Sequence, residues 1–209
     1  MKVDIFFDTI CPWCRIGKNH LIQAIETWKG DKVDVRFRAF LLDASVPTEG
    51  RDYSLVIDQF GGKARVDTMF AQVCKIGEVC GLNFHFDRIK KMPNTMLSHR
   101  LIKLAPKERK SAVIELISKA YFEDGLDIGR MDTLLEIADR AELNQAEMKK
   151  QLLSQEGIAE IHEDVTLAQK VGIRSIPYFI INDRYSLQNP QSADSFLEAF
   201  ERIKEKQFS

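Results

Sequence analysis

The sequence predicts an α/β fold that carries a large, all-helical insertion. Residues 3–7 form a short apolar run, and residues 33–40 alternate apolar and polar side chains, as in a strand with one buried face. A long middle segment then shows only helical periodicity. Another strand-like run, residues 176–181, follows near the end of the chain. We therefore expect the two terminal segments to form one sheet.

The predicted domain boundaries follow from where the strand-like patterns stop. Residues 1–42 and 158–209 are expected to form one domain that is split in the sequence, and residues 43–157 to form the helical insertion. Within the insertion, Asn144 followed three residues later by Glu147 is a helix-start signal.

Composition and charge narrow the classes of function. The chain has 209 residues, 44% apolar and 29% charged, with a formal net charge of -1 and both signs interspersed, so nucleic acid is not an expected partner. We find neither the pattern of a secretory signal nor an apolar run long enough to span a bilayer, so we expect a cytoplasmic location without a membrane partner. In that compartment a cysteine pair is more often catalytic or metal-binding than a structural disulfide.

Cys11 and Cys14 stand where the first predicted strand meets a predicted helix. Their spacing places the two thiols within disulfide reach, and the free amides at the helix start favour a thiolate on the first. Disulfide exchange needs an attacking thiolate and a second thiol that resolves the mixed disulfide. We therefore predict that Cys11 is the catalytic nucleophile and Cys14 the resolving thiol. Half of a zinc site, or two core thiols, is the alternative.

Pro177 opens the returning strand, where it can bring backbone groups alongside Cys11. The sequence alone does not specify the isomer of the Ile176–Pro177 bond, and the general rarity of cis X–Pro bonds favours trans.

Several motifs together resemble one known family. The order of strand, Cys-Pro-Trp-Cys, helix, helical insertion and Gly-Ile-Arg-Ser-Ile-Pro-Tyr-Phe is similar to the thioredoxin-fold DsbA family, and most similar to its FrnE-like cytoplasmic branch. The resemblance covers essentially the whole chain and includes the segments 94–95, 98–101, 120–122 and 168–179. It implies a thioredoxin-like fold, a cis Pro177 that faces the cysteines, and thiol–disulfide oxidoreductase activity on peptide or protein disulfides. We accordingly assign Pro12, Trp13, Ile176 and Pro177 to substrate binding.

Two departures from the family pattern qualify this expectation. Trp13 occupies a slot where strongly oxidising members have histidine, so a disulfide reductase or isomerase is expected rather than a strong oxidant. Asn189-Pro190-Gln191 replaces the Gly-Ala-Gln that commonly follows the last strand.

A related branch comprises 2-hydroxychromene-2-carboxylate isomerases and kappa-class glutathione transferases. Those proteins resemble this chain in the helical insertion, so a glutathione-dependent isomerase or transferase is the alternative function. They usually have serine at the position of Cys11, so cysteines at positions 11 and 14 argue against that chemistry. Glutathione is also a candidate redox partner; no other cofactor and no metal are expected. The oligomeric state stays open, with a homodimer as one option.

Asp8 and His99 are candidate modulators of the cysteine pair. Asp8 precedes Cys11 by three residues and can relay the thiol proton, or can be a solvated residue at a strand end. His99 belongs to a segment shared with the family and is expected to approach the site.

Cys74 and Cys80 are expected on one helix. Six residues correspond to roughly 9 Å along a helix axis, beyond the Cα separation of about 7 Å that a disulfide tolerates. Cys74 shares a helix face with Phe70, which favours a buried structural thiol. A helix break at Gly77 would instead allow a second redox pair, and a zinc site of all four cysteines is a further alternative. His20 lies too far along its helix from Cys11 to affect that sulfur directly.

Overall fold

The structure is a computed structural model that describes residues 1–59 and 61–205. The strands are β1 (Lys2–Phe7), β2 (Asp34–Ala39), β3 (Arg51–Asp52), β4 (Lys91–Met92), β5 (Tyr178–Ile181) and β6 (Tyr185–Gln188). The α-helices are α1 (Pro12–Thr27), α2 (Tyr53–Gln59), α3 (Lys63–Val79), α4 (Met96–Leu104), α5 (Lys110–Phe122), α6 (Met131–Arg140), α7 (Gln145–Leu153), α8 (Ile158–Val171) and α9 (Ala193–Glu205). Two short 3-10 turns, Phe86–Arg88 and Lys107–Arg109, complete the list.

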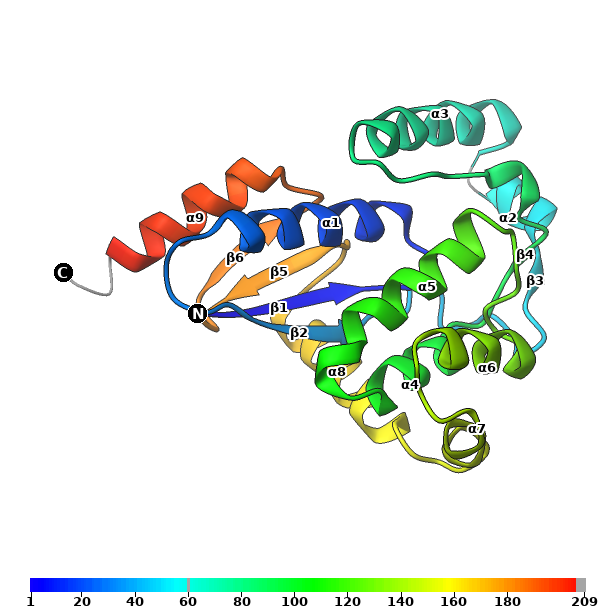
Figure 1. Cartoon of the computed structure of the whole chain (residues 1–209). Coiled ribbons are helices and arrows are strands. Elements are labelled where there is room, and N and C mark those ends of the chain that lie inside the picture. The colour runs from blue at the N-terminus through cyan, green and yellow to red at the C-terminus, as the bar shows by residue number, and fades with distance from the viewer. Residues whose placement is uncertain (60, 206–209) are drawn as a thin grey trace.

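One four-stranded sheet joins the two ends of the chain. Its order is β2-β1-β5-β6, with β1 parallel to β2 and antiparallel to β5, and β6 antiparallel to β5. The prediction that the terminal segments share a sheet is therefore confirmed. Figure 1 shows the helices of the insertion at the end of the sheet toward which β1 runs, away from the N-terminus and from α9.

The two faces of the sheet carry different layers, with α1 and α9 on one face and α8 on the other (Figure 1). Ile5 of β1 pairs with Phe179 of β5, and the Phe179 ring packs edge-on against Phe196 of α9 at 4.8 Å between ring centroids. Because side chains alternate along a strand, Asp4 lies on the opposite face, toward α8.

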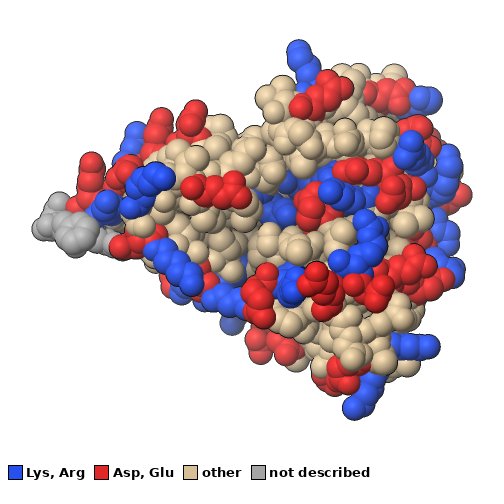
Figure 2. Space-filling model, viewed as in Figure 1, with Lys and Arg blue, Asp and Glu red and all other residues tan. Residues whose placement is uncertain are grey.

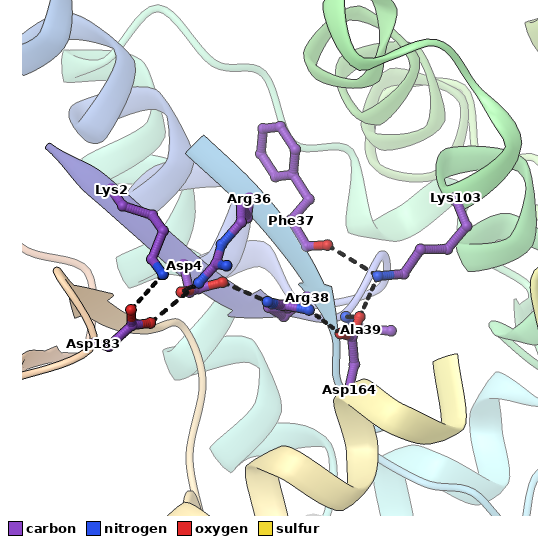
Figure 3. A network of polar contacts seen from close by, with 9 residues as sticks. All are labelled: Lys2, Asp4, Arg36, Phe37, Arg38, Ala39, Lys103, Asp164 and Asp183. Carbon is purple, nitrogen blue, oxygen red and sulfur yellow. Dashed lines mark hydrogen bonds and ion pairs between the residues drawn. The ribbon is translucent and has the colours of Figure 1, made fainter. Parts of the chain in front are cut away.

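That second face is held by an ionic network around two buried carboxylates, Asp4 and Asp164, in addition to apolar contacts (Figure 3). Arg38 Nε donates to Asp4 Oδ1 at 2.7 Å, and Arg38 Nη1 donates to Asp164 Oδ1 at 2.9 Å. Asp164 of α8 also accepts from the Ala39 amide at 2.8 Å and from Lys103 of α4. The polar side chains of β2 therefore bind two buried carboxylates, and Asp164 ties the sheet to the insertion.

Among the described residues of the insertion, the strands are confined to one short ladder, in which Arg51 of β3 pairs with Met92 of β4. Each of these strands has two residues, too few to show an alternating pattern in the sequence. The expected helix start at Asn144 is confirmed, since its side chain accepts a hydrogen bond from the Glu147 amide at 2.9 Å.

Lys and Arg are interspersed with Asp and Glu on the face shown in Figure 2. Among the described residues, no helix has the length and apolar character needed to cross a membrane.

Candidate active site

The cysteine pair lies at the start of α1. Cys11 is the N-cap residue in an extended conformation, and Pro12 follows as the first helical residue, where a missing N–H costs nothing. The Cys14 amide donates to Cys11 Sγ at 3.3 Å and also to the Cys11 carbonyl oxygen at 3.1 Å, so an amide of the first helical turn points at the first sulfur. Both thiols are free, and both are buried. This geometry stabilises negative charge on Cys11 Sγ.

Cys14 has the opposite character. Burial raises its pKa well above the usual value of a thiol, and its hydrogen bond and proximity to Cys11 raise it further. A neutral Cys14 thiol can donate to a Cys11 thiolate, so the two sulfurs take different roles although they are three residues apart.

The loop before β5 forms a wall beside Cys11. The Ile176–Pro177 bond is cis, which confirms the isomer implied by the family resemblance. The Ile176 carbonyl oxygen lies 4.0 Å from Cys11 Sγ. On its other side Pro177 packs against α1 at Gly17, where a Cβ atom would lie only 2.9 Å from Pro177 Cγ. Gly17 thus permits the close approach of the helix to this loop.

The side chains of Asp8 and His99 contact each other close to the cysteine pair. His99 Nε2 lies 3.2 Å from Asp8 Oδ1, both side chains are buried, and Asp8 Oδ2 accepts from the Leu42 amide at 2.8 Å. The interpretation of Asp8 as a solvated residue is therefore wrong. A cavity of about 10 Å³, lined in part by Asp8, Cys11 and Cys14, lies next to the pair; that is close to the room one water needs.

A groove of about 530 Å³ opens in front of Cys11. It lies between residues 1–42 and 158–209, here called the sheet domain, and the insertion, residues 43–157. Its lining is mostly apolar and includes Trp13 and Ile176 from the sheet domain. From the insertion, Tyr53, Phe70 and Phe86 form a stack, with ring centroids 6.4 Å and 3.8 Å apart. Burial raises the pKa of Tyr53 to about 12, so its hydroxyl is neutral at physiological pH.

The sequence did not reveal these three groove residues. Phe70 stands in a helical stripe of apolar residues, and such a stripe has the same appearance whether it faces a core or a groove. The remaining predicted site residues, Pro12, Trp13, Ile176 and Pro177, all lie within the site, but their roles toward a substrate stay predictions.

The other two cysteines lie apart from this site. Helix α3 runs without a break through Gly77, so a second redox pair created by a break there is ruled out. Cys74 is partly exposed rather than buried, and Cys80 lies beside His20. Among the described residues, no three His, Cys, Asp or Glu side chains are grouped to hold a metal ion, so the four-cysteine zinc site is not formed.

Residues 2–201 match the family of the DSBA-like thioredoxin domain. The chain belongs to this family. Among solved structures, a protein from Streptomyces coelicolor described as a probable DsbA oxidoreductase is 24% identical, with a TM-score of 0.87 over 97% of this chain and 89% of that one. The cytosolic disulfide reductase DsbM from Pseudomonas aeruginosa, solved with GSH, is 18% identical, with a TM-score of 0.66 over 100% and 99% of the two chains.

A 2-hydroxychromene-2-carboxylate isomerase is 12% identical, with a TM-score of 0.71 over 100% of both chains. At these identities the structures show a shared fold. The predicted thioredoxin-like fold and the resemblance to DsbA proteins are therefore confirmed.

Proposed function

We propose that this protein is a cytoplasmic thiol–disulfide oxidoreductase that reduces or isomerises peptide and protein disulfides. The observation that carries the proposal is the unequal pair at the start of α1. Cys11 Sγ accepts a hydrogen bond from the Cys14 amide at the helix start, whereas burial raises the pKa of the Cys14 thiol. An attacking thiolate beside a protonated resolving thiol is the arrangement that disulfide exchange requires.

The reaction then proceeds in two exchanges. Cys11 Sγ attacks one sulfur of the substrate disulfide, the substrate S–S bond breaks, and the first substrate thiolate leaves and takes up a proton. Cys14 next loses its proton and attacks Cys11 Sγ, which releases the second substrate thiol. The substrate gains two electrons, and the protein is left with a Cys11–Cys14 disulfide. A thiol such as glutathione returns the pair to the reduced state.

In this proposal, surrounding residues position the substrate and move the proton. The backbone at Ile176 and Pro177 lies beside Cys11, and Trp13 borders the apolar groove that receives the neighbouring part of the substrate. The buried pair of Asp8 and His99 accepts the proton that Cys14 must lose, through the small cavity that Asp8 shares with Cys14.

Two variants test the proposal directly. Cys11→Ser should abolish reduction of a peptide disulfide, while Cys14→Ala should accumulate a mixed disulfide at Cys11, detected by non-reducing mass spectrometry. Undiminished turnover in Cys11→Ser would refute the proposal. Titration of the wild-type protein in glutathione buffers then gives the potential of the pair, and thereby the direction of catalysis in the cytosol.

The structural similarity to DsbM, which was solved with GSH, supports glutathione binding as a second candidate function. A glutathione-dependent isomerase or transferase should bind glutathione specifically even after Cys14→Ala. Loss of binding in that variant would favour simple disulfide exchange.

A further inference from the structure

Cys80 and His20 form a second pair of a thiol and a base, away from the groove at Cys11. His20 Nε2 lies 3.0 Å from Cys80 Sγ, and His20 Nδ1 lies 2.7 Å from the backbone oxygen of Gln191. A carbonyl oxygen only accepts hydrogen bonds, so Nδ1 carries the hydrogen. In the neutral ring Nε2 is then the acceptor that faces the thiol.

This is the arrangement of an activated nucleophile, in which a base takes the thiol proton and a third group orients the base. Burial raises the pKa of the Cys80 thiol. The thiolate therefore forms by transfer of the thiol proton to His20 Nε2, 3.0 Å away, which leaves two opposite charges in contact. His20 is nine residues beyond Cys11, about 13 Å along the helix, so the pair acts separately from the first one.

We propose that Cys80 is a second reactive thiol, which His20 activates for exchange with low-molecular-weight disulfides. The Cys80 thiolate attacks one sulfur of the small disulfide, whose S–S bond breaks as a new bond to Cys80 forms. The other half leaves as a thiolate and takes the proton held at His20 Nε2. Cys80 is thereby oxidised to a mixed disulfide, and one half of the small molecule is reduced to a thiol. This step does not depend on the chemistry proposed for Cys11.

The position of Cys80 connects its modification to the groove. Cys80 caps the end of α3, and Asn19 Nδ2 of α1 donates to the Cys80 carbonyl oxygen at 3.4 Å. Helix α3 has 17 residues, of which Val66, Val73 and Gly77 are buried. Few of its side chains therefore pack against the rest of the protein. The same helix supplies Phe70 to the groove. A group attached to Cys80 displaces His20 and loosens this end of α3 from α1 (Figure 1).

The test uses oxidised glutathione with the full-length protein, and peptide mass mapping to follow each cysteine separately. Cys74 serves as an internal control, because it is also partly exposed on the same stretch but its Sγ faces the Phe84 carbonyl oxygen at 3.7 Å instead of a base. We expect Cys80 to be modified at least about tenfold faster than Cys74. His20→Asn retains a donor for the Gln191 carbonyl but removes the base, and should lower the rate at Cys80 to that of Cys74.

Equal rates at the two cysteines, or a rate at Cys80 that His20→Asn leaves unchanged, would overturn the proposal. If His20→Asn does not fold, as judged by circular dichroism, the ratio of the two rates in the wild-type protein still decides. Hydrogen exchange of the α3 amides should increase after modification, and should stay unchanged in Cys80→Ser treated in the same way. Equal protection of α3 in the modified and unmodified protein would overturn the link to the groove.

Discussion

Gly17 is the point at which helix α1 contacts the loop that faces Cys11, and Gly17→Ala tests whether this contact positions the site. A Cβ atom at residue 17 would lie 2.9 Å from Pro177 Cγ and 3.2 Å from Phe179 Cζ. Carbon atoms prefer separations of about 3.5–4.0 Å, so the Pro177 ring or the helix must move by roughly 0.6 Å. Either movement changes the 4.0 Å distance between Cys11 Sγ and the Ile176 carbonyl oxygen.

The expected magnitudes follow from two opposing effects. Alanine improves the helix by about 1 kcal/mol relative to glycine, while overpacking costs about 1–3 kcal/mol. The free energy of unfolding should therefore fall by about 0–2 kcal/mol. The catalytic rate should be affected more strongly than the stability, because a misplacement of reacting groups by about 1 Å can lower a rate a hundredfold. We expect about a tenfold loss in kcat/KM.

The assay is reduction of a fluorogenic peptide disulfide, combined with urea unfolding of the same samples. Ala24→Gly is the matched control, because Ala24 is fully buried on the same helix but lies two turns away from Gly17. It should lose at least about 1 kcal/mol of stability while its kcat/KM stays within about twofold of wild type. A folded Gly17→Ala protein with wild-type kcat/KM would refute the positioning role of this contact.

Other consequences of the structure can be measured independently. Because the pKa of Cys14 is raised by burial, its thiolate fraction should grow about tenfold per pH unit from neutral pH toward that pKa. The rate at which Cys14 resolves the mixed disulfide should rise in proportion, as measured by rapid-quench mass spectrometry. A pH-independent rate would contradict this. His99→Gln should slow the same step about tenfold at neutral pH, with alkylation of Cys11 as the control that should not change. Phe70→Ala should raise KM for apolar peptide disulfides about fivefold or more and leave kcat nearly constant; an unchanged KM would exclude Phe70 from the substrate site. Asp164→Asn removes the buried carboxylate that Arg38 and Lys103 share, and should lower the free energy of unfolding by about 3 kcal/mol. A loss below about 1 kcal/mol in urea unfolding would show that the network is weakly coupled.

Much of the fold could be predicted because the sequence patterns that specify its strands and helices are local. The alternation in residues 33–40, the apolar run before Cys11 and the capping pair at Asn144 each depend on neighbours within a few residues. Even so, the alternation of β2 indicated only that one face is buried. The sequence could not show that Arg38 on the other face binds Asp164, which is 126 residues away.

The spacing of Cys11 and Cys14 at a helix start predicted a pair of thiols with different roles, because spacing and helix end act within one turn. Tertiary packing decided what surrounds that pair. Asp8 meets His99 across 91 residues, and His20 meets Cys80 across 60. Contacts of this kind depend on how the insertion docks on the sheet, and no local periodicity encodes that docking.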